Sequence, residues 1–186
     1  MRQAYYFLVA SLPSLHWGQW ESGSLEYFLT SCQKELSSPD LAAIKNIDLE
    51  GDVVVQNANP ILRAWAGLNQ KLRNEVAQLR AKKAGKNPAD IIRGTLDEGP
   101  MIAETVLLAS KAQDPLETQK VLDQFRWQWL ETWAAGQYFN LEFLLIYALK
   151  LKILERYKNI SISPKGREVF AEYKNEFSEE LAEDIK

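Results

Sequence analysis

The spacing of apolar residues predicts that this chain is built from α-helices. Apolar side chains recur every three or four positions along most of its length, which places them on one side of a helix. The clearest stripe predicts a long, charged helix over residues 60–83, with successive steps of 4, 3, 4, 4 and 3: Ile61, Trp65, Leu68, Leu72, Val76 and Leu79. Shorter helices are predicted over residues 24–36, 39–47, 101–111, 115–135, 141–158 and 164–181.

Five prolines mark where helices are expected to begin. Each follows a residue whose side-chain oxygen can accept a hydrogen bond from a free amide of the first turn, and proline at the first helical position loses no hydrogen bond. The dipeptides are Ser38-Pro39, Asn59-Pro60, Asn87-Pro88, Asp114-Pro115 and Ser163-Pro164. Gly85 and Gly136 follow apolar stripes and are expected to end helices.

Two segments do not fit this pattern cleanly. Residues 4–12 are consistent with either a buried strand or a helix, because a short apolar run does not distinguish the two. Val53–Val55 is the only other segment with strand character, and it is too short to build a sheet. The fold class is therefore predicted to be all-α, a compact bundle of about six to eight helices.

Two of the predicted helices are expected to form the core. Residues 141–158 begin with an apolar run on every side of the helix, which is typical of a central helix. In the helix over residues 115–135, Phe125, Trp129 and Trp133 share one side and Trp127 points the other way. A core position is the simpler reading for these aromatics, but Trp127 is also the best candidate for a contact with a partner, since tryptophan is enriched at binding hot spots.

The length of 186 residues and an apolar fraction of 46% predict a single globular domain. Residues 84–100 contain three glycines and two prolines, so they could instead form a mobile connection between two sub-bundles. The longest uninterrupted apolar run, Phe143–Leu149, is far shorter than the roughly 20 residues of a membrane-spanning helix. The expected location is the cytoplasm.

Charge is distributed in three blocks. Residues 1–60 carry a net charge of −4, residues 61–93 carry +6 and residues 94–186 carry −5. The basic residues of the middle block suggest a partner-binding surface formed by Lys71, Arg73, Arg80, Lys82 and Lys83. The alternative is solvated charge that pairs with the acidic blocks of the same chain.

The sequence offers little material for catalysis. With one histidine and one cysteine, it excludes a disulfide framework and cysteine–histidine zinc motifs. His16 and Cys32 could form a base and a nucleophile, but a loop histidine and a packed cysteine are the simpler reading. Gly94–Gly99 lacks the lysine of a phosphate-binding loop. We therefore expect no enzymatic activity, no cofactor and no metal.

Three segments together resemble a known family. They are Tyr5–Pro13, Leu72–Lys83 and Phe139–Tyr157, which span nearly the whole chain. The sequence resembles an uncharacterised bacterial family encoded in V-type ATPase operons. Residues 147–159 are also similar to the C-terminal helix of the V-type ATPase central-stalk protein of the d-subunit type.

The resemblance implies an all-α protein that contacts other V-type ATPase subunits, at the central stalk or the membrane rotor ring, without catalysing a reaction. It would associate with the inner membrane only through that complex. The chain is little more than half as long as the d-type stalk protein, so a stable subunit and an assembly protein both remain open. The alternatives are a helical adapter that binds RNA or acidic proteins through residues 71–86, and a small enzyme that uses carboxylates.

Overall fold

The computed structural model describes residues 5–19, 23–50, 59–87 and 100–162, and all its regular structure is helical. The helices are α1 (Tyr6–Ser11), α2 (Leu25–Glu35), α3 (Ser38–Lys45), α4 (Pro60–Lys83), α5 (Pro100–Ala109), α6 (Pro115–Ala134) and α7 (Leu141–Ile162). These seven helices confirm the predicted all-α bundle with one long charged helix over residues 60–83. The expected helix over 164–181 and the segment Val53–Val55 lie outside the described residues.

The helix starts predicted from Asn59-Pro60 and Asp114-Pro115 are confirmed, and the one predicted from Ser38-Pro39 is displaced by one residue. The Asn59 side chain accepts a hydrogen bond from the Ile61 amide at 2.9 Å, and Asp114 accepts one from the Leu116 amide at 2.7 Å. Helix α3 begins one residue earlier than expected, because Ser37 and not Ser38 caps it. Asn87-Pro88 and Ser163-Pro164 lie outside the part of the chain that the structure describes.

The helix ends follow the glycine signals. Gly85 has a φ of +65° and Gly136 a φ of +84°, a backbone conformation that other residues adopt only at a cost. Residues 4–12, which the sequence left open between strand and helix, contain the short helix α1. Helix α7 extends beyond the predicted end at 158, and its described part reaches Ile162.

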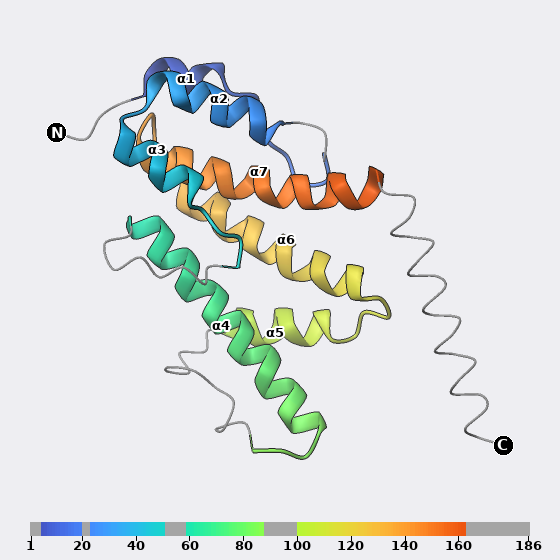
Figure 1. The fold of residues 1–186 in the computed structure, drawn as a ribbon. Coiled ribbons are helices and arrows are strands. Elements are labelled where there is room, and N and C mark those ends of the chain that lie inside the picture. The colour runs from blue at the N-terminus through green and yellow to red at the C-terminus, as the bar shows by residue number, and fades with distance from the viewer. Residues whose placement is uncertain (1–4, 20–22, 51–58, 88–99, 163–186) are drawn as a thin grey trace.

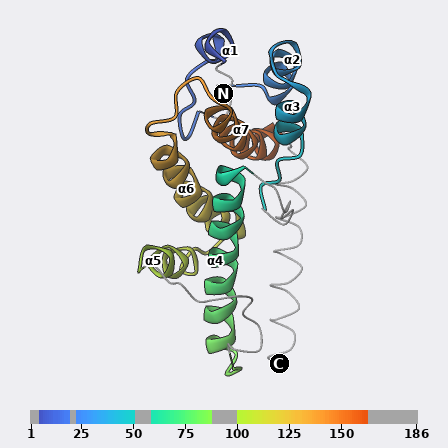
Figure 2. The same cartoon turned by 90° about the vertical axis from the view of Figure 1, so that its left-hand side faces the viewer.

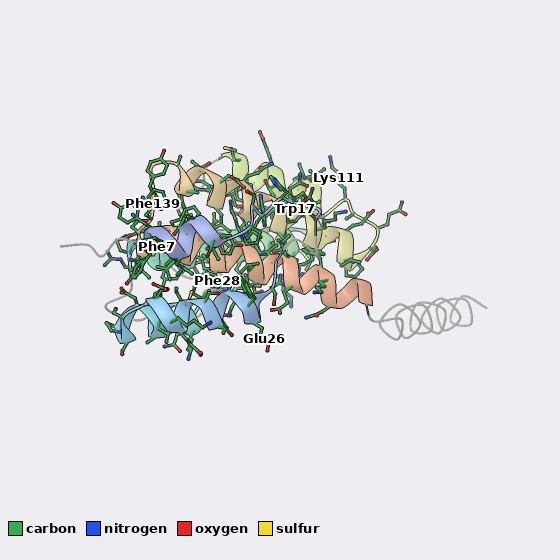
Figure 3. All side chains as sticks on the ribbon, turned by 90° about the horizontal axis from the view of Figure 1, so that it is seen from above. Phe7, Trp17, Glu26, Phe28, Lys111 and Phe139 are labelled. Carbon is green, nitrogen blue, oxygen red and sulfur yellow. The ribbon has the colours of Figure 1, made fainter. Side chains whose placement is uncertain are left out.

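Helix α7 forms the centre of the core, as its all-round apolar sequence predicts. It packs against α2 and α3 on one side and against α6 and α4 on the other (Figures 1 and 2). Leu144, Leu145, Leu149 and Ile153 are completely buried. Phe28 of α2 lies against α7, with its ring 5.2 Å from that of Tyr147 (Figure 3).

The two aromatic faces of α6 are both used inside the fold. Phe125, Trp129 and Trp133 stack along one side, with ring centroids 6.3 and 5.6 Å apart. Trp127 is 4% exposed; its ring lies 5.8 Å from Trp17, and the Lys150 ammonium lies 5.1 Å from its centre. In this fold α6 is sandwiched, and the face that carries Trp127 is covered by the loop after α1 and by α7.

Helix α4 is the element that reaches furthest from α7. Its first half packs under α7, and its second half continues past the core beside α5, which also packs against α6 (Figure 2). Residues 88–99, within the connection expected near 84–100, lie outside the described residues. The basic half of α4 is thus presented at one end of the molecule, flanked by α5 and α6.

Two substitutions in α4 should change stability in opposite directions. Asn59→Ala removes the cap and should lower the free energy of unfolding by about 1 kcal/mol. Gly67→Ala places a methyl group on an exposed helix position where nothing lies within 4 Å, so it should raise stability by about 1 kcal/mol. Urea denaturation of both variants measures this, and a shift of the same sign in both would contradict these helix boundaries.

Candidate interaction site

A groove runs between the second half of α4 and the helices α5 and α6. It consists of two adjoining cavities with volumes of about 600 and 570 Å³. The cavities share Val76 and Arg80 from α4 and Gln119 and Leu122 from α6. Because these four residues line both cavities, the two lie side by side along α4 and α6, and together we call them the α4–α5–α6 groove.

The groove has an apolar floor and a basic edge. The aliphatic residues of its lining come from all three helices: Leu72, Val76, Ala77, Leu79, Val106, Ala109 and Leu122. Four cationic residues of α4 and its C-terminal turn line it: Arg73, Arg80, Lys83 and Lys86. Arg80, Lys83 and Lys86 are exposed. Basic side chains at the C-terminal end of α4 also interact favourably with the negative end of the helix dipole. This interaction stabilises the helix and is a structural reason for some of these residues that needs no partner.

The groove brings together only part of the partner surface that the sequence suggested. Arg73, Arg80 and Lys83 line it, whereas Lys71 and Lys82 do not. The division follows the helix period, since residues 73, 80 and 83 fall on the side of α4 that faces α6 and α5. Trp127 is buried elsewhere in the core.

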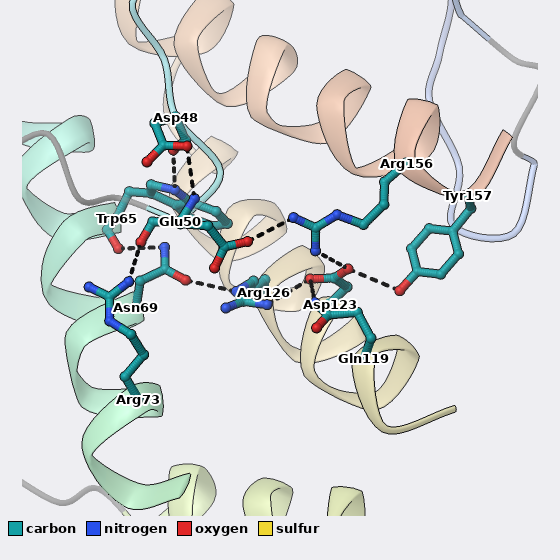
Figure 4. A network of polar contacts seen from close by, with 10 residues as sticks. All are labelled: Asp48, Glu50, Trp65, Asn69, Arg73, Gln119, Asp123, Arg126, Arg156 and Tyr157. Atoms are coloured by element: carbon teal, nitrogen blue, oxygen red, sulfur yellow. Dashed lines mark hydrogen bonds and ion pairs between the residues drawn. The ribbon is translucent and has the colours of Figure 1, made fainter. Parts of the chain in front are cut away.

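A buried polar network lies directly beside the groove and holds its walls together (Figure 4). Its centre is the carboxylate of Asp123, which is 1% exposed. This carboxylate accepts hydrogen bonds from Gln119 at 3.0 Å, Arg126 at 2.7 Å, Arg156 at 3.0 Å and the Tyr157 hydroxyl at 2.9 Å. Helices α6 and α7 are therefore joined through one charge.

The same network reaches α4 and the segment before it. Arg126 donates to the Asn69 side chain at 2.8 Å, and Asn69 donates to the Trp65 carbonyl at 3.1 Å. Arg156 pairs with Glu50 at 2.8 Å, while the Glu50 carbonyl accepts from Arg73 at 2.6 Å. Two arginines, the buried Asp123 and the exposed Glu50 are thus brought together at the junction of three helices, which offsets much of the cost of burying Asp123 and Arg126.

The electrostatics of the network follow from burial and from the carboxylates. Burial raises the pKa of the Tyr157 hydroxyl, and the neighbouring Asp123 carboxylate raises it further, so this phenol stays neutral and donates its proton. Burial alone would lower the pKa of Arg156, but Asp123 and Glu50 more than offset this and raise it. Arg126 and Glu50, which bond to Asn69 and Arg156 respectively, also line the groove.

Sequence reasoning missed this network. Asp123 and Arg126 lie three positions apart on a helix, a spacing that suggests a local ion pair but not a buried one. Asn69 lies on the apolar side of the long helix and could have been recognised as a buried polar position that needs a partner. Nothing in the sequence connects Glu50 to Arg156, which are 106 positions apart.

The two candidate catalytic residues do not form a site. Cys32 is completely buried in α2, and burial raises the pKa of its thiol to about 12, which keeps it protonated and unreactive near neutral pH. His16 is exposed in the loop after α1. Cys32 behaves as a small core residue.

The described residues contain neither a cluster of metal-binding side chains nor a membrane-spanning helix. No group of three or more histidine, cysteine, aspartate or glutamate side chains in these ranges could hold a metal ion. None of the helices in the described ranges is long and apolar enough to cross a membrane.

Comparison with known proteins gives one match. Residues 96–181 match the model of a family described as "Protein of unknown function (DUF2764)". The match includes α5, α6 and α7, and therefore two of the three helices that form the groove. No curated protein and no solved structure shows significant similarity to the chain.

Removing the charge at the centre of the network should destabilise the fold. Asp123→Asn keeps the shape but leaves Arg126 without its paired carboxylate and Arg156 with Glu50 alone, so we expect a loss of about 3 kcal/mol in the free energy of unfolding. Urea denaturation measures it. The control Glu104→Gln removes an exposed carboxylate of α5 and should cost less than about 0.5 kcal/mol. Equal effects of the two substitutions would contradict a central role for Asp123.

The buried thiol predicts a specific pH dependence. In the unfolded chain Cys32 ionises from its ordinary value of 9.0, whereas in the folded protein it stays neutral to about 12. Its contribution to stability is therefore complete below pH 9.0 and is lost as the pH rises, by about 1.4 kcal/mol per pH unit. In urea denaturation between pH 9.0 and 10.0 the wild type should therefore lose about 1 kcal/mol more than Cys32→Ala, because the buried tyrosines, whose ordinary value is 10.0, contribute equally to both proteins. Equal slopes would disprove it.

Proposed function

We propose that this protein is a non-catalytic subunit or accessory protein of a bacterial V-type ATPase and that it acts by binding another subunit in the α4–α5–α6 groove. The observation that carries the binding mode is the combination of an apolar floor with a cationic edge. The ATPase assignment itself comes from the sequence resemblance of the three segments. In the cell the protein would be cytoplasmic and would reach the inner membrane through the complex.

The length of the groove along α4 matches that of a short helix. Its lining extends along α4 from Leu72 to Lys83, about 16 Å at 1.5 Å per residue. An amphipathic helix of about three turns could place its apolar face on the aliphatic floor, as in other helix-in-groove complexes. Its acidic residues would meet Arg80, Lys83 and Lys86, so the expected partner is an acidic amphipathic helix of another subunit.

The three segments that carry the resemblance have distinct places in the fold. Leu72–Lys83 supplies the groove wall. The other two meet on the opposite side of the molecule, where the Tyr147 hydroxyl donates to the Pro13 carbonyl at 3.0 Å and the rings of Tyr6 and Phe139 lie 4.8 Å apart. This arrangement supports a division between a structural part and a binding part.

The groove favours an acidic protein over RNA as the ligand. Among the described residues that line it, none has an aromatic side chain on which a base could stack, although stacking supplies much of the affinity for single-stranded nucleic acid. An aliphatic floor instead suits leucine, valine or phenylalanine side chains of a helix. RNA binding through residues 71–86 is accordingly an outcome for the test to exclude.

The test is recovery of ATPase subunits from native membranes with the tagged full-length chain. We compare wild type with Arg80→Glu and with the matched control Lys82→Glu, since both side chains are exposed on α4 but only Arg80 lines the groove. Wild type and Lys82→Glu should recover ATPase subunits equally. Arg80→Glu should recover about tenfold less, the effect of a lost charge contact worth roughly 1.4 kcal/mol.

Two results would contradict the proposal. Recovery of no ATPase subunit by the wild type would overturn the assignment to this complex. Equal losses in both variants would show that binding follows the overall charge of α4 and not the groove. A bound fraction that disappears after nuclease treatment would favour the RNA-binding alternative.

A further inference from the structure

The C-terminal end of α7 lies beside the groove. Arg156 pairs with Glu50, which lines the groove, at 2.8 Å, and Tyr157 bonds to Asp123, which in turn bonds to the groove residue Gln119. Helix α7 continues from there for about 7.5 Å to Ile162. The chain therefore leaves the described structure close to one wall of the groove.

The antiparallel pairing of α6 and α7 shows where on that wall it leaves. Lys150 pairs with Glu131 and Tyr157 with Asp123, so moving forward along α7 means moving backward along α6. The end of α7 and the start of α6 therefore point to the same end of the helix pair, where the two axes diverge in Figure 1, and Asp114, Pro115 and Thr118 at the start of α6 line the second cavity.

The chain beyond α7 has the sequence of an acidic amphipathic helix. Its aromatic and leucine side chains follow steps of three, four and four, at Phe170, Tyr173, Phe177 and Leu181. From Phe170 to Leu181 this stripe would be about 16 Å long as a helix, the same length as the groove lining from Leu72 to Lys83 on α4. If residues 168–181 form the helix, the six steps from Ile162 to Glu168 could span up to about 20 Å, more than the roughly 16 Å length of the groove lining.

The charges of the two parts are complementary. Between Glu168 and Asp184 the chain carries seven carboxylates and one lysine. The α4 edge of the groove carries Arg73, Arg80, Lys83 and Lys86. On a helical wheel Glu176 and Glu180 lie on one flank of the apolar stripe, where they would meet such an edge.

The family match gives a further reason to treat this segment as part of the same unit. It does not stop at the end of α7 but continues to Leu181, the last residue of the apolar stripe. Residues 163–181 are thus matched together with two of the groove's helices.

We propose that residues 168–181 of this same chain dock into the α4–α5–α6 groove as an amphipathic helix, with Phe170, Tyr173, Phe177 and Leu181 on its apolar floor. The segment is then an internal ligand that any external helix must displace. A short tether gives such a ligand an effective concentration on the order of millimolar, so even weak docking lowers the apparent affinity for a partner. The docking itself does not rest on the proposed ATPase function; only the competition with a partner does.

The test is amide hydrogen exchange of the purified full-length protein, followed over Phe170–Leu181. On the segment we compare Phe177→Asp, in the apolar stripe, with the matched control Asn175→Asp, on the opposite side of the helix. On the groove we compare Arg80→Glu with Lys82→Glu, and add Val76→Asp in the floor. The amides of α7 report whether each variant remains folded.

The amides of the segment should exchange about tenfold more slowly in the wild type and in the two control variants, Asn175→Asp and Lys82→Glu, than in the other three variants. Those three are Phe177→Asp, Arg80→Glu and Val76→Asp. Exchange in α7 should be the same in every variant. Exchange of the segment at the same rate in every variant would overturn the proposal. Protection that is lost in Phe177→Asp but kept in both groove variants would place the segment elsewhere and would equally overturn it. Protection that grows with protein concentration would overturn docking within one chain and assign the groove to the segment of a second copy.

This experiment is independent of the membrane recovery experiment, because it contains no ATPase. A failed recovery of ATPase subunits would not change the exchange result. A negative exchange result would overturn docking of the segment, but it would not affect the recovery of ATPase subunits by the wild type. If both ideas hold, Phe177→Asp should recover more ATPase subunits than the wild type, because it frees the groove.

Discussion

The carboxylate of Asp123 is the point on which the arrangement of α4, α6 and α7 depends. It neutralises Arg126 and Arg156 inside the fold, and these arginines extend the contact to Asn69 of α4 and to Glu50. Apolar packing alone would allow the helices to slide or rotate, whereas unpaired buried charges would cost several kcal/mol. The network therefore fixes the register of three helices.

The groove is a consequence of that register. With α6 held against α7 by Asp123, its Gln119 and Leu122 face the second half of α4 across an opening that α5 closes from the other side. Helix α4 is long enough to extend beyond the core, and its basic turns are exposed there (Figure 2). The same geometry brings the end of α7 to the groove, which is why an acidic partner and the chain's own acidic segment would compete for one surface.

Much of the fold could be read from local sequence signals. The boundaries of α4 and the starts of α6 and α2 follow from residues that act within a few positions, such as the Asn59 and Asp114 caps. The central position of α7 also follows from its sequence, because a helix that is apolar on every side has to be covered on every side. The predicted start of α3 is one residue too late, because Ser37 and Ser38 carry the same hydroxyl group and the local sequence does not show which of them caps the helix.

The candidate site was only partly predictable, for a physical reason. Sequence by itself determined the helices and the central place of α7, because these depend on periodicity along one helix. Only the tertiary structure decided that Trp127 is covered, that Asp123 is buried between two arginines, and that α5 and α6 complete a groove with α4. Those features depend on contacts between residues far apart in the chain, such as Glu50 with Arg156, and nothing in the local pattern fixes which distant side chains will meet.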